Sequence, residues 1–180
     1  FNAINEDKAS VVTDQIERFT ENGITLKSGE KLDADIIITA TGLNMEVAGD
    51  INIDIDGKNL DISSKMFYKS MMIADVPNMV VTFGYTNASW TLKADLTAEY
   101  ACRLINHIDK KGYDYCVAIT DETIEEDGVW LDFTSGYVER AKHKFPKQGA
   151  KAPWTNTQQY LSDLFAVRYG RIKDKDLKFF

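Results

Sequence analysis

The sequence predicts an α/β fold, α+β as an isolated piece, in which a β-meander is followed by a strand-turn-helix unit and a helical tail. Three observations support this order. Residues 11–41 carry apolar segments separated by two turn signals, residues 80–96 combine a short apolar strand with a polar turn and a helix start, and helical periodicity recurs after residue 135. No internal repeat or low-complexity tract interrupts the chain.

The meander is predicted from its turns. Asn22-Gly23 is a strong short hairpin signal, and Ser28-Gly29 marks a second turn. A third strand is expected from Asp35 to Thr39, where Ile36-Ile37-Ile38 places apolar side chains on both faces of a strand. That strand should therefore be buried, with a layer of structure on each side.

Residues 46–79 are irregular and strand-poor, with short strands expected near Ile51–Ile55 and Phe67–Met72. A buried strand is predicted from Val80 to Phe83. A helix should begin near Thr91 and end at Gly112 behind two lysines. Its apolar stripe would be formed by Leu92, Leu96, Tyr100, Ala101, Leu104, Ile105 and Ile108.

Two further helices are predicted in the tail. One should run from about Ser135 to Lys144 and stop at Pro146; the other should start at Thr155, in a capping box with Gln158, and end at Gly170. Aromatic residues at the edges of these segments fit either a core or the lining of a substrate channel, and the core is the more common role. They are Trp130, Tyr137, Trp154 and Tyr160.

Length, charge and the distribution of apolar residues limit the classes of function that this chain can have. A chain of 180 residues can form one domain or part of a larger one, and its formal net charge of -7 argues against nucleic acid as a partner. Its basic stretch, Arg140–Lys151, is interpreted as surface. No apolar stretch is long enough for a membrane span. We expect a cytoplasmic protein in which Cys102 and Cys116 are reduced, and we expect no metal site. Phe1 is not an initiator methionine, so we expect it to lie inside a longer reading frame.

Residues 80–96 are the best candidate for a ligand site. Gly84 allows a sharp turn or a close approach of backbone to another group, and the polar residues after it lead into a helix start. Unpaired N–H groups and the positive end of the helix dipole favour electron-rich atoms there.

Two stretches carry a resemblance to a known family. They are Asp35-Ile-Ile-Ile-Thr-Ala-Thr-Gly42, and TFGYTNASWTLKADL from Thr82 followed by KFPKQGAKAPW from Lys144. Together they resemble the flavin-containing monooxygenases, most closely their Baeyer-Villiger branch. The resemblance covers nearly all of the chain but only the C-terminal portion of such an enzyme. It implies a flavoprotein with two dinucleotide-binding domains. In such a protein, residues 1–43 would be the end of the NADPH-domain meander and the crossover, and residues 44–112 would be the C-terminal part of the FAD-binding domain. Residues 113–180 would be a helical C-terminal extension.

The resemblance also implies cofactor-binding residues. Thr41 and Gly42 would lie near the flavin or the domain crossing, although Gly42 could simply end a strand. The loop before the predicted helix would face the pyrimidine edge of the flavin, although a capped helix with Trp90 as a packing anchor would look the same. Its residues are Tyr85, Thr86, Asn87, Ala88, Ser89 and Trp90. No catalytic residue is assigned, and Lys93 and Asp95 are given no role.

The function implied for the parent protein is that of an FAD- and NADPH-dependent monooxygenase. It would use O2 to insert one oxygen atom into a ketone or onto a sulfur or nitrogen centre of a small organic substrate. The chain has no G-x-G-x-x-G motif and no F-x-G-x-x-x-H-x-x-x-W signature. By itself it should therefore be inactive, marginally stable and rich in exposed apolar surface, with self-association through exposed sheet edges.

Two alternatives remain open from the sequence. A stand-alone acidic α+β protein-binding domain without a cofactor would fold cooperatively and expose little apolar surface. The tail of a flavin-dependent disulfide reductase is disfavoured because the chain has no redox cysteine pair.

Overall fold

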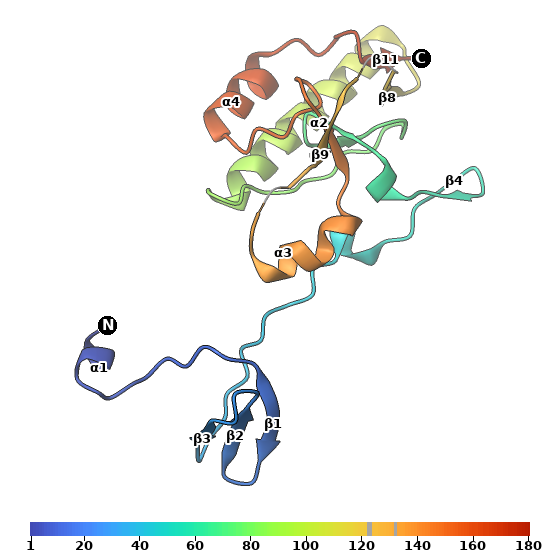
Figure 1. Cartoon of the computed structure of the whole chain (residues 1–180). Helices are drawn as coiled ribbons and strands as arrows, with labels where there is room; N and C mark the ends of the chain where they lie inside the picture. Colours follow the sequence, from blue (N-terminus) through green and yellow to red (C-terminus); the bar gives the residue numbers. More distant parts are fainter. Residues whose placement is uncertain (122–123, 132) are drawn as a thin grey trace. The chain divides into compact units, whose positions relative to one another are not determined.

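The computed structural model describes residues 1–121, 124–131 and 133–180 (Figure 1). The chain forms two compact units, Phe1–Gly42 and Leu43–Phe180, and each is described by itself. Both contain helices and small antiparallel sheets, so the mixed α+β character expected from the sequence is confirmed.

The first unit is built on a three-stranded meander. A short helix, α1 (Asn2–Asn5), precedes the strands β1 (Ile16–Thr20), β2 (Gly23–Leu26) and β3 (Lys31–Asp33), which pair in the order β1-β2-β3. Thr20 pairs with Gly23, so the hairpin turns at Glu21 and Asn22, one residue before the Asn22-Gly23 pair that predicted it. A Cβ atom on Gly23 would lie 2.0 Å from the carbonyl oxygen of Leu32, so only glycine fits at this start of β2.

The predicted buried strand from Asp35 to Thr39 is wrong. These residues form no strand in the structure, and Ile36 and Ile38 are 80% and 85% exposed. A strand with apolar side chains on both faces needs a layer on each side, and β3 ends at Asp33 without pairing to this run. These exposed isoleucines agree with the expectation that the chain exposes apolar surface when the rest of the parent protein is missing.

The second unit is organised around α2 (Trp90–Lys111), a helix of 22 residues. Its start near Thr91 and its end at Gly112 were both predicted correctly. Its buried face includes the predicted Leu96, Tyr100 and Leu104, but Lys93 and Thr97 are buried as well. Ile105, expected on the buried stripe, is 57% exposed.

Gly112 gives the first testable prediction. It closes α2 in the left-handed conformation, with φ of 68°, where an L side chain is strained. We expect Gly112→Ala to lower the free energy of unfolding by about 1 kcal/mol, measured by urea titration of the helical circular dichroism signal. Gly136→Ala is the matched control because Gly136 has no positive φ and its added Cβ meets only the end of the Arg140 side chain, at 3.4 Å. Equal effects of the two changes would contradict the prediction.

The second unit also contains four pairs of short strands. The hairpins are β4 (Asp54–Ile55) with β5 (Lys58–Asn59) and β6 (Phe67–Tyr68) with β7 (Met72–Ile73), and the longer-range pairs are β8 (Cys116–Ala118) with β11 (Leu177–Phe179) and β9 (Glu126–Val129) with β10 (Lys147–Gly149). Short 3-10 turns occur at η1 (Val47–Asp50) and η2 (Ile62–Ser64). Of the strand expected near Ile51–Ile55 only Asp54–Ile55 forms. The segment Phe67–Met72, expected as one strand, folds back on itself at Lys69 and Ser70, so that Tyr68 pairs with Met72 in a hairpin. The predicted strand from Val80 to Phe83 is reduced to an isolated bridge between Met72 and Val80, because this segment has no longer partner strand.

The tail helices were predicted in part. The first, α3 (Gly136–Ala141), continues as η3 (Lys142–Lys144) and ends before Pro146 as expected. The second, α4 (Tyr160–Leu164), continues as the π-helical η4 (Phe165–Tyr169) and ends at Gly170. Its predicted start at Thr155 is wrong because the Thr155 hydroxyl donates to the carbonyl oxygen of Gly149, at 2.7 Å, and caps no helix.

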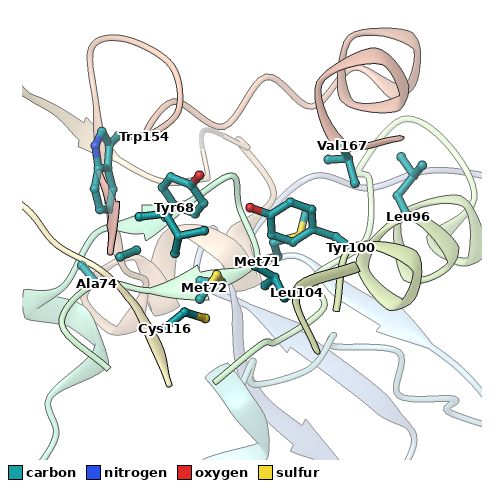
Figure 2. Close-up of a cluster of buried hydrophobic side chains, with 12 residues drawn as sticks. Tyr68, Met71, Met72, Ala74, Leu96, Tyr100, Leu104, Cys116, Trp154 and Val167 are labelled. Atoms are coloured by element: carbon teal, nitrogen blue, oxygen red, sulfur yellow. The ribbon is translucent and has the colours of Figure 1, made fainter. Parts of the chain in front are cut away.

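Two apolar clusters fill the second unit. The first gathers Tyr68, Met71, Met72, Tyr100 and Trp154 between α2, β6, β7 and β8 (Figure 2). The second gathers Phe67, Ile73, Trp130 and Phe145, with Val81 and Phe83 against it. Trp130 and Trp154 are therefore core residues, as the more common interpretation of their positions predicted. Within the described residues no helix is both long and apolar enough to cross a membrane, and no group of side chains is arranged to hold a metal ion.

Candidate functional site

The loop before α2 has a buried inner side and an exposed outer side. Tyr85 is 2% exposed, whereas Thr86, Asn87, Ala88 and Ser89 are exposed and Trp90 is 55% exposed. The structure thus brings together all six loop residues predicted from the sequence, at the start of a long helix. Tyr85 connects the loop to the core, Thr86, Asn87, Ala88 and Ser89 expose backbone and small side chains, and the large Trp90 ring is partly exposed.

A buried ionic cluster holds the inner side of the loop. The Tyr85 hydroxyl donates to Asp163 Oδ2 at 2.7 Å, and Lys93 Nζ donates to the same oxygen at 2.8 Å. Thr157 Oγ1 donates to the other carboxylate oxygen at 2.8 Å. Burial, together with the hydrogen bond to Asp163, raises the pKa of Tyr85 well above its ordinary value. The loop is therefore tied to both α2, through Lys93, and α4, through Asp163, two helices that lie side by side in Figure 1.

A second set of hydrogen bonds holds the next residue of the loop. Gln158 Oε1 accepts from the backbone N–H of Thr86 at 2.8 Å and from its hydroxyl at 3.1 Å. Gln158 donates in turn to Asn156, whose side-chain amide donates to the carbonyl oxygen of Trp130 at 2.9 Å. These contacts connect the loop to the segment before α4 and to the second apolar cluster.

Gly84 permits a close contact with an aromatic ring. A Cβ atom at this position would lie 2.2 Å from Cγ of Trp90, so the indole ring lies directly against the glycine backbone. The same indole contacts Phe83, with ring centroids 4.9 Å apart. Trp90 therefore covers the base of the loop from one side, and any side chain at residue 84 would displace it.

The start of α2 is available to an electron-rich group. Ser89 is the N-cap residue, but its side chain makes no capping hydrogen bond; its hydroxyl pairs with the Thr91 hydroxyl at 2.7 Å. The first turn contains no acidic residue. A 22-residue helix with an uncapped, exposed N-terminus favours a negatively charged or electron-rich partner there.

Thr41 and Gly42 are the last two residues of the first unit, whereas the loop before α2 belongs to the second unit. Both are exposed, and Gly42 has φ of 88° with open space where a Cβ would stand. The left-handed conformation accounts for a glycine at this position. Their proximity to a flavin stays a prediction.

Sequence reasoning missed the residues that anchor the loop. Lys93 was assigned no role, Asp163 was not singled out, and Gln158 was named only as the capping-box partner of Thr155. One signal was present: Lys93 precedes Leu96 and Tyr100 on the apolar side of α2, where a cation requires a buried partner. Its partner, 70 positions away in the sequence, was not identifiable from spacing.

Basic side chains of the stretch Arg140–Lys151 lie at the surface, as predicted, although Phe145 within it is buried. Lys144 pairs with Glu46 and Lys147 pairs with Glu126, at 2.6 and 2.9 Å, and all four side chains are at least 39% exposed. Cys102 is an exposed free thiol and Cys116 a buried one, also as predicted.

Comparison with known proteins identifies relatives along almost the whole chain. It is 50% identical over 179 residues to the FAD-containing monooxygenase EthA of Mycobacterium tuberculosis (strain ATCC 25618 / H37Rv), an alignment that covers 99% of this chain and 37% of EthA. It is 51% identical over 180 residues to the probable FAD-binding monooxygenase AlmA of Acinetobacter baylyi, covering 99% of this chain and 36% of AlmA. The putative FAD-containing monooxygenase MymA of Mycobacterium tuberculosis is 41% identical over 180 residues, with the same two coverages. The chain thus spans little more than a third of the length of these relatives. No protein-family model and no solved structure matches it.

Proposed function

This chain is homologous over 99% of its length to FAD-containing monooxygenases, and on that premise we propose that it forms the C-terminal part of an FAD- and NADPH-dependent monooxygenase of the Baeyer-Villiger type. In the proposed reaction NADPH provides two electrons and O2 provides both oxygen atoms. One oxygen enters a ketone beside its carbonyl, or adds to a sulfur or nitrogen centre, and the other leaves as water.

The homology carries the proposal, and the loop before α2 fits it. Bound FAD supplies a ring that accepts a hydride from NADPH and passes electrons to O2. The uncapped N-terminus of α2 would stabilise negative charge at the edge of that ring, and the small residues Ala88 and Ser89 allow close approach. Tyr85 and Gln158 hold this loop in place from behind through their hydrogen bonds. For the first unit, the proposal is that Thr41 and Gly42 lie near the flavin or at the domain crossing.

The chain by itself should bind neither cofactor. The dinucleotide phosphates of FAD and NADPH are held by glycine-rich motifs that these 180 residues lack. The exposed Ile36 and Ile38 also favour this proposal over a stand-alone protein-binding domain, because they need strands from the rest of the protein to cover them.

The proposal is tested on the full-length protein that contains this segment. We expect it to be purified with an equimolar amount of FAD, read from its visible absorbance, and to oxidise NADPH with uptake of O2. A full-length protein that holds no flavin after reconstitution with FAD would contradict the proposal.

A substitution at Gly84 tests the role of the loop. We expect Gly84→Ala in the full-length protein to weaken FAD binding by roughly tenfold, because the new methyl group displaces Trp90 and shifts the loop. The affinity is measured by titrating the apoprotein with FAD and following flavin fluorescence. Gly136→Ala is the control because its Cβ meets only a flexible arginine end, and it should bind FAD normally. If both variants bind FAD as the unmodified protein does, the loop does not face the flavin.

A further inference from the structure

Gln158 has a backbone conformation that is uncommon for a residue with a side chain. Its φ is 50°, in the left-handed region, where a Cβ atom is strained. Such a conformation persists only where the surrounding contacts fix it, and strained residues of this kind gather at binding sites and active sites. The contacts of Gln158 therefore indicate what the residue does.

The Gln158 side chain is directed at the loop before α2. Its Oε1 atom accepts a hydrogen bond from the backbone N–H of Thr86 at 2.8 Å and another from the Thr86 hydroxyl at 3.1 Å. The two residues are 72 positions apart in the sequence. A single oxygen atom therefore holds both the backbone and the side chain of Thr86, which fixes the peptide group between Tyr85 and Thr86 in space.

Asn156 fixes the orientation of the Gln158 amide. Asn156 Oδ1 accepts from the Ser70 hydroxyl at 3.1 Å, and its Nδ2 donates to the carbonyl oxygen of Trp130 at 2.9 Å. With its own amide set in this way, Asn156 presents Oδ1 to Gln158 Nε2, at 3.2 Å. Gln158 must then turn its oxygen toward Thr86, because the reversed amide would place two donors against each other. The acceptor that Thr86 meets is thus determined by a chain of contacts that reaches back to Ser70.

The contact with Gln158 also decides which N–H groups of the loop remain available. The N–H of Thr86 is used inside the protein, whereas those of Asn87 and Ala88 have no hydrogen-bond partner within the described part of the chain. Both residues are exposed. They lie between Thr86, which Gln158 holds, and the start of α2, so their backbone is fixed at both ends. Donors that are already oriented stabilise negative charge more strongly than donors that must first be ordered.

We propose that Gln158 is a positioning residue for the flavin. By holding Thr86 it orients the N–H groups of Asn87 and Ala88 toward the edge of the flavin ring, where they stabilise the negative charge of the reduced form. This inference rests on the proposed function, because it names the residue that sets the geometry of the same site. Gln158 contacts neither the flavin nor the substrate and acts through Thr86 alone. The C-terminal tail thereby influences how readily the flavin is reduced.

The first measurement uses the 180-residue chain and requires no flavin. Gln158→Met removes the acceptor and the donor but keeps a side chain of similar length. In amide spectra of the 15N-labelled chain, we expect this change to shift the signals of Asn87 and Ala88 and to accelerate hydrogen exchange at the Thr86 N–H about tenfold. Gln159→Met is the matched control, because the Gln159 side chain is exposed and makes no capping hydrogen bond to α4. Identical spectra around Thr86 in the two variants would overturn the role of Gln158.

The second measurement is the reduction potential of the flavin in the full-length protein. Gln158→Met should make reduction about tenfold less favourable, which for a two-electron couple lowers the potential by about 30 mV. Gln159→Met should leave the potential unchanged. A loss of stability alone would not move this readout.

A glycine variant separates the side-chain contact from the backbone strain. Glycine adopts the left-handed conformation freely but has no amide group to offer Thr86. Gln158→Gly should therefore lower the potential as much as Gln158→Met does. An unchanged potential in Gln158→Gly would contradict the inference.

The two measurements separate this inference from the proposed function. A full-length protein that holds no flavin after reconstitution would refute the proposed function, whereas the amide signals of the 180-residue chain would still decide whether Gln158 positions the loop. A flavin-loaded protein that oxidises NADPH and has the same potential with Gln158→Met as with Gln159→Met would refute the role of Gln158 alone.

Discussion

Replacing Asp163 by alanine is expected to destabilise the second unit by about 3 to 5 kcal/mol, because the change leaves a buried cation without its partner. The Lys93 side chain is 3% exposed and that of Asp163 13%, so little water reaches the pair. The same carboxylate also accepts the hydrogen bonds of Tyr85 and Thr157. The effect is measured by urea unfolding of the 180-residue chain at pH 7, followed by the helical circular dichroism signal.

Asp95→Ala is the matched control for this prediction. Asp95 is an acid on α2 that pairs with Arg168 at 3.4 Å, but its side chain is 75% exposed. Exposed ion pairs contribute little, so its loss should cost less than about 1 kcal/mol. The double variant Lys93→Met with Asp163→Leu should recover part of the stability, because it removes both charges together but still leaves the Tyr85 hydroxyl without its acceptor. If Asp163→Ala costs no more than Asp95→Ala, the buried cluster does not hold the loop.

Alkaline unfolding is the second large effect that we expect. Burial is the main cause that raises the pKa of Tyr68, of Tyr85, and of Tyr100, the last to about 12. An unfolded tyrosine loses its proton near pH 10, so the stability that these groups contribute is complete below pH 10 and is lost as the pH rises further. For Tyr100 alone the loss amounts to about 3 kcal/mol at pH 12 and above.

Lys69 changes the stability with pH in the opposite direction to the tyrosines. Its ammonium lies 3.6 Å from Asp174 and contacts the Tyr100 hydroxyl, and burial lowers its pKa. The unfolded chain therefore binds more protons than the folded one below the ordinary lysine pKa, and this term favours folding as the pH rises toward that value. Above pH 10.5 it adds nothing further, and the tyrosines dominate.

The measurement is a paired titration from pH 8 to pH 13. Phenolate absorbance should show a late step that coincides with the loss of the helical signal, because the three buried tyrosines titrate only when the second unit unfolds. Tyr100→Phe should reduce the late step. Complete titration of all tyrosines in a chain that keeps its helical signal would contradict the prediction.

The resemblance to known enzymes could be recognised from the sequence because the residues that carry it lie in contiguous stretches. The relatives at 50% and 51% identity confirm the resemblance to flavin-dependent monooxygenases that those stretches suggested. The residues of the loop before α2 could be listed for the same reason, since they follow one another in the chain. Their role toward the flavin stays a proposal.

Local patterns also predicted the elements whose cause is local. The Asn-Gly hairpin, the start and end of α2 and the end of the last helix at Gly170 all follow from residues within a few positions of one another. The predictions failed where a partner far along the chain decides the outcome. The run from Asp35 to Thr39 has the composition of a buried strand, yet it forms none because no strand of its unit pairs with it.

What the sequence by itself determined about this protein is its resemblance to flavin-containing monooxygenases, its main helix and the loop that precedes that helix. Only the tertiary structure decided how the loop is held, because Asp163, Gln158 and Trp130 reach it or its surroundings from parts of the chain that spacing does not connect. It also decided that Lys93 belongs to the interior. A charged side chain can be buried only where folding brings it a partner of opposite charge, and that requirement concerns distance in space, which a linear pattern does not contain.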